Sequence, residues 1–211
     1  MLDIIRKNGI ILAIFAAITT GLTAMIHEVT KPAIQAQKAL TQQNLLDQVL
    51  PPTLYNNALQ SSCYIVCDPA LGDNKEHRLY IAKKDTQPVA VALETTAPDG
   101  YSGNIQIIVG ANFNGLIYGV RVIEHHETPG LGDKIELRLS NWINDFFHQK
   151  VDKYCNGNFA VKKDGGDFDQ FTGATITPRA VVNAVKRSTL YIQTLPGHIS
   201  HLKKCNNKIE E

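Results

Sequence analysis

Residues 104–125 read NIQIIVGANFNGLIYGVRVIEH, and this stretch determines the fold that we expect for the chain. Asn114-Gly115 separates two runs rich in β-branched residues, which is the strongest short signal for a β-hairpin, because a type I′ turn needs positive φ at both central positions. Upstream, RLYIA (78–82) and VAVALETT (89–96) flank a short polar turn and read as two more strands. The sequence therefore predicts an antiparallel sheet of about four strands.

Two helices are expected to cover this sheet. Residues 133–150 place apolar side chains at helical spacing, which predicts an α-helix packed on the sheet. Its apolar face comprises Ile135, Leu139, Trp142, Ile143 and Phe146. A last helix is predicted from Pro178 to about Gln193, with Thr177 as its N-cap and Pro178 as its first residue. Its buried side comprises Val181, Val182, Val185 and Ile192. The predicted fold class is therefore α+β, a mostly antiparallel sheet flanked by helices.

The overall composition narrows the class of protein. A chain of 211 residues suits one domain with appendages or two small domains. With 44% hydrophobic and 19% charged residues, it can bury a core of normal size. The net charge is +1 and no basic run is present, so the positive footprint that nucleic-acid binding requires is missing. We therefore expect no nucleic-acid partner.

The N-terminal segment NGIILAIFAAITTGLTAMIH (8–27) carries no formal charge. Twenty helical residues span roughly 30 Å, about the thickness of the hydrocarbon core of a bilayer. A buried core helix would show a polar face, which this segment barely has. A cleaved signal peptide would need small residues before its cleavage site, and Leu22-Thr23-Ala24 fit that requirement poorly. An uncleaved transmembrane anchor is the preferred interpretation.

The flanks of this segment bear on its continuation and orientation. Helical composition continues to Leu50, and Pro51-Pro52 then ends the helix. Arg6-Lys7 precede the segment, although lysines also follow it closely, so the charge balance only mildly favours an N-terminus in the cytoplasm.

The four cysteines form an even set, Cys63, Cys67, Cys155 and Cys205, which is compatible with disulfides in an oxidising compartment. Three pairings are possible and the sequence does not choose among them, although Cys63 and Cys67 are close enough to pair across a tight loop. A metal site would need Cys-x-x-Cys spacing or a nearby histidine, and CYIVC supplies neither. Unpaired buried thiols are the remaining alternative.

Residues 169–181, DQFTGATITPRAV, hold three threonines around a Gly-Ala corner where the last helix begins. The simplest interpretation is structural: Thr177 caps the helix and Gly173 permits a turn. The alternative is a binding site, because the free N–H groups and the positive dipole end of a helix N-terminus favour a phosphate. Arg179 could pair with that phosphate, and the Thr175 hydroxyl is then a possible site for a phosphoester.

These residues resemble a known motif. Asp169, Thr172-Gly173-Ala174-Thr175 and Thr177 match the pattern Asp-x-x-[Ser/Thr]-Gly-Ala-[Ser/Thr]-x-[Ser/Thr], in which a threonine hydroxyl carries FMN through a phosphoester bond. GYSG (100–103) and HETPGLGDK (126–134) look like the other signature stretches of such FMN-binding domains. Over residues 2–192 the chain resembles the G subunits of Rnf (Rsx) ion-translocating electron transport complexes. The sister family, the C subunits of sodium-translocating NADH–quinone reductases, shares the motif and stays as an alternative.

The resemblance implies a cofactor and the residues around it. It implies covalent FMN on Thr175, with the surrounding site formed by Asp169, Thr172, Gly173, Ala174, Thr177, Arg179, Tyr101, Glu127, Thr128, Pro129, Gly130 and Leu131. The turn residues of HETPGLG would let the backbone approach a flat ring. The adjacent pair His125-His126 would make a poor chelate in an extended chain, so no metal site is predicted.

The resemblance also implies the role of the chain. No catalytic residue is assigned, because no nucleophile–base pair and no dinucleotide fingerprint are evident. The expected function is electron relay through FMN beside the other subunits of a membrane complex, after maturation by a flavin transferase that uses FAD and magnesium. A flavin-free anchored scaffold or binding module and a threonine or serine hydrolase, for which no convincing base is found, are the alternatives.

The expected organisation follows from the anchor and the resemblance together. Residues 1–28 form a cytoplasmic tail and a transmembrane anchor, residues 29–52 a helical stalk, residues 53–196 a periplasmic FMN-binding domain and residues 197–211 a polar tail. The expected location is the bacterial inner membrane, crossed once, with most of the chain in the periplasm.

Overall fold

The computed structural model describes residues 2–153 and 157–205. The chain divides into two compact units, Met1–Asn44 and Leu45–Glu211, and each is described by itself. Two α-helices occur in the described residues, α1 (Leu2–Val49) and α2 (Ile176–Thr194). Eight short 3₁₀ helices are η1 (Pro52–Leu54), η2 (Leu59–Ser62), η3 (Pro69–Leu71), η4 (Gly132–Ile135), η5 (Asn141–Phe146), η6 (Lys162–Asp164), η7 (Leu195–Gly197) and η8 (Ile199–His201).

The first unit is the N-terminal part of α1. Its apolar side chains are exposed, from Ile4 at 66% to Val29 at 69%. The hydroxyls of Thr19 and Thr23 donate to the carbonyls of Phe15 and Thr19, each at 2.9 Å, so these polar groups are satisfied within the helix. Among the described residues, α1 is the one helix long and apolar enough to cross a membrane, which is consistent with a membrane anchor.

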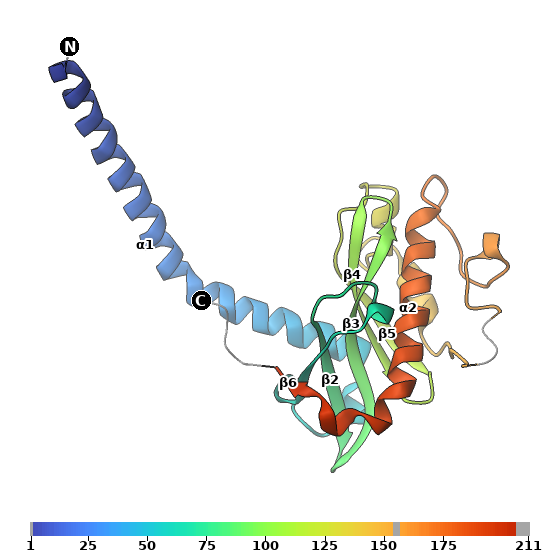
Figure 1. Cartoon of the computed structure of the whole chain (residues 1–211). Helices are drawn as coiled ribbons and strands as arrows, with labels where there is room; N and C mark the ends of the chain where they lie inside the picture. Colours follow the sequence, from blue (N-terminus) through green and yellow to red (C-terminus); the bar gives the residue numbers. More distant parts are fainter. Residues whose placement is uncertain (1, 154–156, 206–211) are drawn as a thin grey trace. The chain divides into compact units, whose positions relative to one another are not determined.

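The second unit is built on one six-stranded antiparallel sheet (Figure 1). Its strands are β1 (Cys63–Val66), β2 (His77–Lys84), β3 (Gln87–Gly100), β4 (Gly103–Asn112), β5 (Ile117–Glu124) and β6 (Lys203–Lys204), in the order β5-β4-β3-β2-β1-β6. The prediction of an α+β fold with an antiparallel sheet is confirmed. The expected four strands are β2 to β5, and the sheet gains the short strands β1 and β6 at one edge.

Alternation along the strands gives the sheet two buried faces. On one face α2 packs against the sheet (Figure 1). The core there includes Leu79, Leu93 and Val109. The predicted apolar side of this helix is confirmed, since Val181, Val182, Val185 and Ile192 are all at most 1% exposed. On the other face, the last turn of α1 and the residue after it bury Leu46, Val49 and Leu50 against Tyr80, Ala92 and Ile108.

Two paired glycines make room for the end of α1 on the sheet. Gly110 of β4 lies opposite Gly119 of β5. A methyl group added at Gly110 would overlap the carbonyl group of Val49, and one at Gly119 would lie 2.8 Å from the carbonyl oxygen of Gln48. The helix therefore reaches the sheet at a place where only glycine leaves enough space.

The β4–β5 hairpin forms as predicted, but its turn is not type I′. Gly115 has a φ of 84°, whereas Asn114 does not have a positive φ. The Gly115 N–H donates to the Asn112 carbonyl (3.1 Å), and the Asn112 side chain accepts from the N–H groups of Asn114 (3.0 Å) and Leu116 (2.9 Å). Because the Asn112 side chain closes this longer loop, only Gly115 needs the left-handed conformation.

The predicted α-helix over residues 133–150 is wrong. The segment contains η4 and η5, and Glu136 between them is extended, with φ −77° and ψ 134°. The Ser140 hydroxyl accepts from the Trp142 N–H (3.1 Å), a local bond that competes with a continuous helix. Four of the five predicted apolar residues are buried all the same, whereas Leu139 is 46% exposed.

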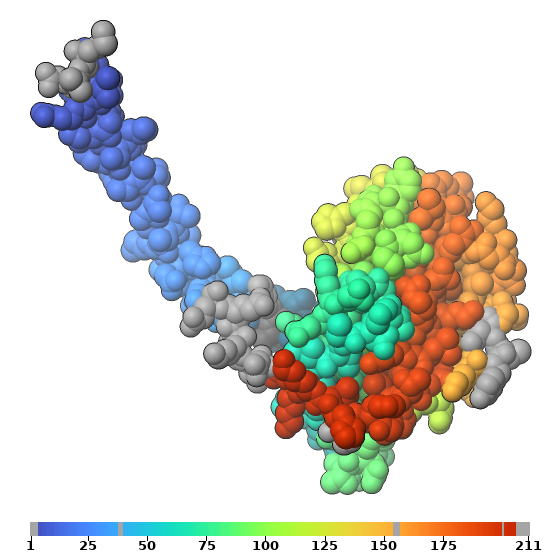
Figure 2. All heavy atoms as spheres, viewed as in Figure 1, coloured from blue at the N-terminus to red at the C-terminus, as the bar shows by residue number. Residues whose placement is uncertain are grey.

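The C-terminal segment returns to the sheet. Cys63 of β1 forms a disulfide with Cys205, and their Cα atoms lie 5.4 Å apart. The possible Cys63–Cys67 pair is therefore not formed; Cys67 is free and exposed, and Cys155 lies outside the described residues. β6 pairs with β1, so Lys203–Lys204 of the expected polar tail form a short edge strand of the sheet. Figure 2 shows the red C-terminal segment at the surface of the second unit.

Candidate functional site

The threonine corner is a tight turn that leads into α2. The Ala174 N–H donates to the Phe171 carbonyl (3.0 Å), and Gly173 between them has a φ of 81°. An L side chain rarely adopts this conformation, so glycine is needed here. The Gln170 side-chain amide donates to the Thr175 carbonyl (3.1 Å) and fixes the exit of the turn.

Thr175 stands at the N-cap position of α2 with a free hydroxyl. The side chain is exposed, and it makes no capping hydrogen bond. Within the described residues the hydroxyl has no hydrogen-bond partner at all. The first N–H groups of a helix have no partners within the helix and favour a negatively charged group. A solvent-accessible hydroxyl therefore lies beside a helix end that suits a phosphate.

Thr177 does not cap the helix, which corrects the prediction. The helix begins at Ile176, so Thr177 lies within its first turn and is fully buried. Its hydroxyl donates to Glu127 Oε2 at 2.6 Å instead of accepting from a backbone N–H. The predicted start of the helix at Pro178 differs from the structure by two residues.

Glu127 joins three segments of the site. Its side chain is only 5% exposed. Oε1 accepts from the Ser102 N–H in the β3–β4 turn (3.0 Å), and Oε2 accepts from Thr177 in α2. The Glu127 N–H donates to His125 Nδ1 (3.1 Å), which fixes the start of its own loop. The carboxylate thereby holds the β3–β4 turn, the loop after β5 and the start of α2 together.

The loop after Glu127 folds back on itself. The N–H groups of Leu131 and Gly132 both donate to the Thr128 carbonyl, each at 3.1 Å. Gly130 has a φ of 77°, as the turn requires. At Gly132 an added methyl group would lie 2.7 Å from Glu127 Oε2 and 2.9 Å from the Thr177 hydroxyl, so the backbone packs directly on these groups.

These three segments enclose a cavity of about 280 Å³. It is lined by Tyr101, Glu127, Thr128, Leu131, Gly132, Gly173, Ala174, Thr175, Ile176 and Thr177. Eight of these ten residues are in the site that the sequence predicted. Ile176 was not in that set, and Gly132 was predicted only as a turn residue of HETPGLG. In the sequence, Ile176 is only an apolar residue near the start of a helix, and nothing marks it as part of a site. The close packing at Gly132 depends on the side chains of Glu127 and Thr177, and Thr177 is distant in the sequence.

Five predicted site residues do not line the cavity. Thr172, Pro129 and Gly130 are exposed in the two turns beside it. Arg179 forms a two-pronged ion pair with Asp164, at 2.6 and 2.8 Å, and the hydrogen bond from Arg179 lowers the pKa of Asp164. The Asp169 carboxylate pairs with Lys162 at 2.6 Å. Both charged groups therefore have partners outside the cavity.

The rim of the cavity exposes apolar side chains. Tyr101 is 68% exposed, Ile176 44% and Leu131 40%, and they come from the β3–β4 turn, the start of α2 and the loop after β5. Exposed apolar residues that gather around a cavity indicate a binding surface. A flat aromatic group could pack on this rim, while the free Thr175 hydroxyl and the helix end would serve a phosphate.

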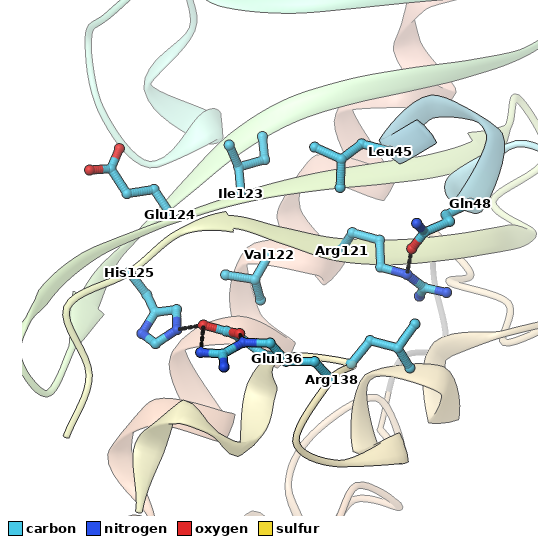
Figure 3. A pocket seen from close by; sticks show the side chains of 10 residues that line it. Leu45, Gln48, Arg121, Val122, Ile123, Glu124, His125, Glu136 and Arg138 are labelled. Carbon is cyan, nitrogen blue, oxygen red and sulfur yellow. Dashed lines mark hydrogen bonds and ion pairs between the residues drawn. The ribbon is translucent and has the colours of Figure 1, made fainter. Parts of the chain in front are cut away.

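Two larger cavities lie beside β5, one of about 430 Å³ and one of about 370 Å³. Both are lined by Gln48 and Arg121, whose side chains are joined by a 2.8 Å hydrogen bond (Figure 3). In the first, Glu136 accepts from both Arg138 and His125 (Figure 3), and the hydrogen bond from Arg138 lowers the pKa of Glu136, with a smaller contribution from His125. Neither cavity contains any of the predicted site residues, so size alone does not identify the site.

Comparisons with known proteins identify the family. Residues 100–189 match the family model of the FMN-binding domain, a range that contains every residue lining the 280 Å³ cavity. Residues 1–49, which include the whole of α1, match the model of the RnfG N-terminal region.

Curated relatives match over the whole chain. The chain is 70% identical to the G subunit of the ion-translocating oxidoreductase complex of Erwinia tasmaniensis, over 100% of both chains. It is 62% identical to the corresponding G subunit of Photorhabdus laumondii (99% of this chain, 100% of that one) and 64% identical to that of Escherichia coli (97% and 99%). A crystal structure of NqrC from Shewanella oneidensis superposes with a TM-score of 0.47 at 19% identity, covering 73% of this chain and 71% of that one. From the full-length matches and the two family models, we conclude that the chain belongs to the family of G subunits of ion-translocating oxidoreductase complexes and contains an FMN-binding domain.

Proposed function

We propose that this protein carries FMN covalently, through a phosphoester on Thr175, and relays electrons through it within an ion-translocating oxidoreductase complex. The observation that carries the proposal is the free Thr175 hydroxyl, which lies exposed at the start of α2 in the wall of the 280 Å³ cavity. When bound, FMN supplies the redox chemistry, and the protein supplies position and electrostatics.

The residues of the cavity fit this cofactor. The N–H groups at the start of α2 favour a phosphate on Thr175. Gly173 leaves open space next to this hydroxyl, because a methyl group added there would meet only Leu131 Cδ2, at 3.4 Å. Tyr101, Leu131 and Ile176 would cover the faces of the isoalloxazine ring and exclude water from them.

The location is part of the same proposal. We place α1 across the bacterial inner membrane, once, with the second unit in the periplasm. The apolar surface of α1 and the Arg6-Lys7 pair at its start support the anchor and its orientation. The Cys63–Cys205 disulfide supports an oxidising compartment for the second unit. The partners would be the other subunits of the complex and, during maturation, a flavin transferase.

The test compares three forms of the full chain, expressed in membranes together with a flavin transferase. Each is denatured and run on a gel, and flavin fluorescence is measured on the protein band. We expect a fluorescent band for the wild type, a dark band for Thr175→Val, which keeps the shape but removes the hydroxyl, and a fluorescent band for Thr175→Ser, which keeps a hydroxyl.

Each alternative has a distinct outcome. Fluorescence that persists in Thr175→Val would show that flavin is attached elsewhere. A dark wild-type band, with a known flavoprotein substrate labelled in the same cells, would contradict the proposal and favour the flavin-free scaffold. Thermal unfolding of Thr175→Val confirms that the variant is folded, and the exposure of this side chain leads us to expect a change within about 0.5 kcal/mol.

A further inference from the structure

Glu127 is the one formally charged residue among the described residues that line the 280 Å³ cavity. Its side chain is almost completely buried, with an exposure of 5%. An ionised carboxylate is costly to bury without compensation, so its retention in the wall of a ligand cavity needs an explanation.

The groups that contact this carboxylate are neutral. They are the Ser102 N–H, at 3.0 Å, and the Thr177 hydroxyl, at 2.6 Å, and both donate. No lysine, arginine or histidine of the described chain forms an ion pair with Glu127. The nearby start of α2 contributes a partial positive charge, but no ion pair within the described residues compensates the carboxylate.

The backbone holds the carboxylate in place. A methyl group added at Gly100 would lie 2.9 Å from Oε1, and one added at Gly132 would lie 2.7 Å from Oε2. Glycine backbone thus packs against both oxygens, and the two hydrogen bonds fix them. The carboxyl group therefore has a fixed position in the cavity wall, largely out of reach of solvent, where the field of a charge is weakly screened.

A fixed negative charge affects a bound redox group in a predictable direction. Reduction adds electrons to that group, and a nearby negative charge disfavours the added electron density. We infer that the buried Glu127 carboxylate is a positioning residue that also lowers the reduction potential of the flavin held in this cavity. This inference rests on the proposed function, and it concerns the properties of the bound flavin and not its attachment.

Two variants separate the charge from the hydrogen bond. Glu127→Gln removes the charge but keeps the shape, because an amide can accept from the Ser102 N–H and donate to the Thr177 hydroxyl. Thr177→Val keeps the charge but removes the hydroxyl donor. Glu124→Gln is the matched control, since Glu124 is an exposed carboxylate three residues away that does not line this cavity.

The measurement is the midpoint reduction potential of the flavin, titrated spectroscopically in the detergent-solubilised full chain against reference dyes. Flavin occupancy is first measured by gel fluorescence. We expect Glu127→Gln to carry flavin and to shift the midpoint to a more positive potential. Glu124→Gln should leave it unchanged, and Thr177→Val should cause no positive shift.

Three outcomes would overturn the inference. The first is an unchanged potential in a loaded Glu127→Gln protein. The second is an equal positive shift in Glu127→Gln and Thr177→Val, which would indicate that the hydrogen bond matters and not the charge. The third is a Glu127→Gln protein that folds but carries no flavin while the wild type does, which would give Glu127 a role in maturation alone. A dark wild type would instead contradict the proposed function.

Discussion

Thr175 and Thr177 are two residues apart and serve different purposes. Thr175 is exposed with a free hydroxyl, whereas Thr177 is buried and its hydroxyl binds Glu127. The sequence motif identifies both, but only the fold distinguishes them. Glu127 lies 50 residues from Thr177 along the chain, so no local pattern could have predicted their contact. The sequence alone therefore predicts a helix N-cap at Thr177.

The Thr177 hydroxyl is expected to contribute to stability. Thr177→Val leaves a buried carboxylate with one hydrogen bond fewer, and a hydrogen bond to a charged group is worth about 1–3 kcal/mol. We therefore expect the free energy of unfolding of the full chain in detergent to fall by about that amount, as measured by urea denaturation. Thr172→Val is the control and should change stability by no more than about 0.5 kcal/mol, because this exposed hydroxyl has no hydrogen-bond partner among the described residues. Equal losses in both variants would contradict the assignment.

At the scale of elements, the sequence predicts those that depend on neighbouring residues, but not those that depend on contacts between distant segments. The β4–β5 hairpin and α2 follow from Asn114-Gly115 and from apolar spacing, and both are present. Residues 133–150 bury most of the side chains expected of a helix, yet they lie in two 3₁₀ helices, because Glu136 is extended and the Ser140 side chain makes a competing local hydrogen bond with the Trp142 N–H. β6 has only two residues and depends on its pairing with β1.

The contact between α1 and the sheet gives a prediction at this scale. Gly110→Ala would place a methyl group into the carbonyl group of Val49, and the backbone must shift to accommodate it. Overpacking of this kind costs about 1–3 kcal/mol, so we expect a lower thermal unfolding midpoint, measured by circular dichroism. Gly197→Ala is the control, because an added methyl group there has no atom within 4 Å. An unchanged midpoint for Gly110→Ala would show that the end of α1 does not pack on these glycines.

At the scale of the whole molecule, the chain divides into two compact units, Met1–Asn44 and Leu45–Glu211. The uncharged segment 8–27 lies in the exposed apolar helix of the first unit, and the second unit has its own core. The pairing of the cysteines was not predictable, because Cys63 and Cys205 are separated by 142 positions and meet only through the sheet.

The presence of the Cys63–Cys205 disulfide in cells is a test of the orientation of the chain in the membrane. Membranes are first denatured and their free thiols are blocked, and the disulfides are then reduced. Reduction should release two new thiols from the Cys63–Cys205 pair. The new thiols are labelled with a maleimide that adds mass, and the labels on the chain are counted on a gel. This result is expected because disulfides persist in the periplasm and not in the cytoplasm. Cys67→Ser, at a free exposed thiol, should release the same number, and Cys205→Ser should release none from this pair. Release of no thiols by the wild type would place the second unit in the cytoplasm.

The exposure of Thr175 has a consequence for the order of events in biogenesis. Its hydroxyl is accessible on a unit whose core and α2 are already complete, so a modifying enzyme can reach it without opening the fold. Folding can therefore come first and loading second. If Thr175 carries FMN as we propose, newly made copies would form a stable, colourless pool, and the number that become electron carriers would be set after synthesis has finished.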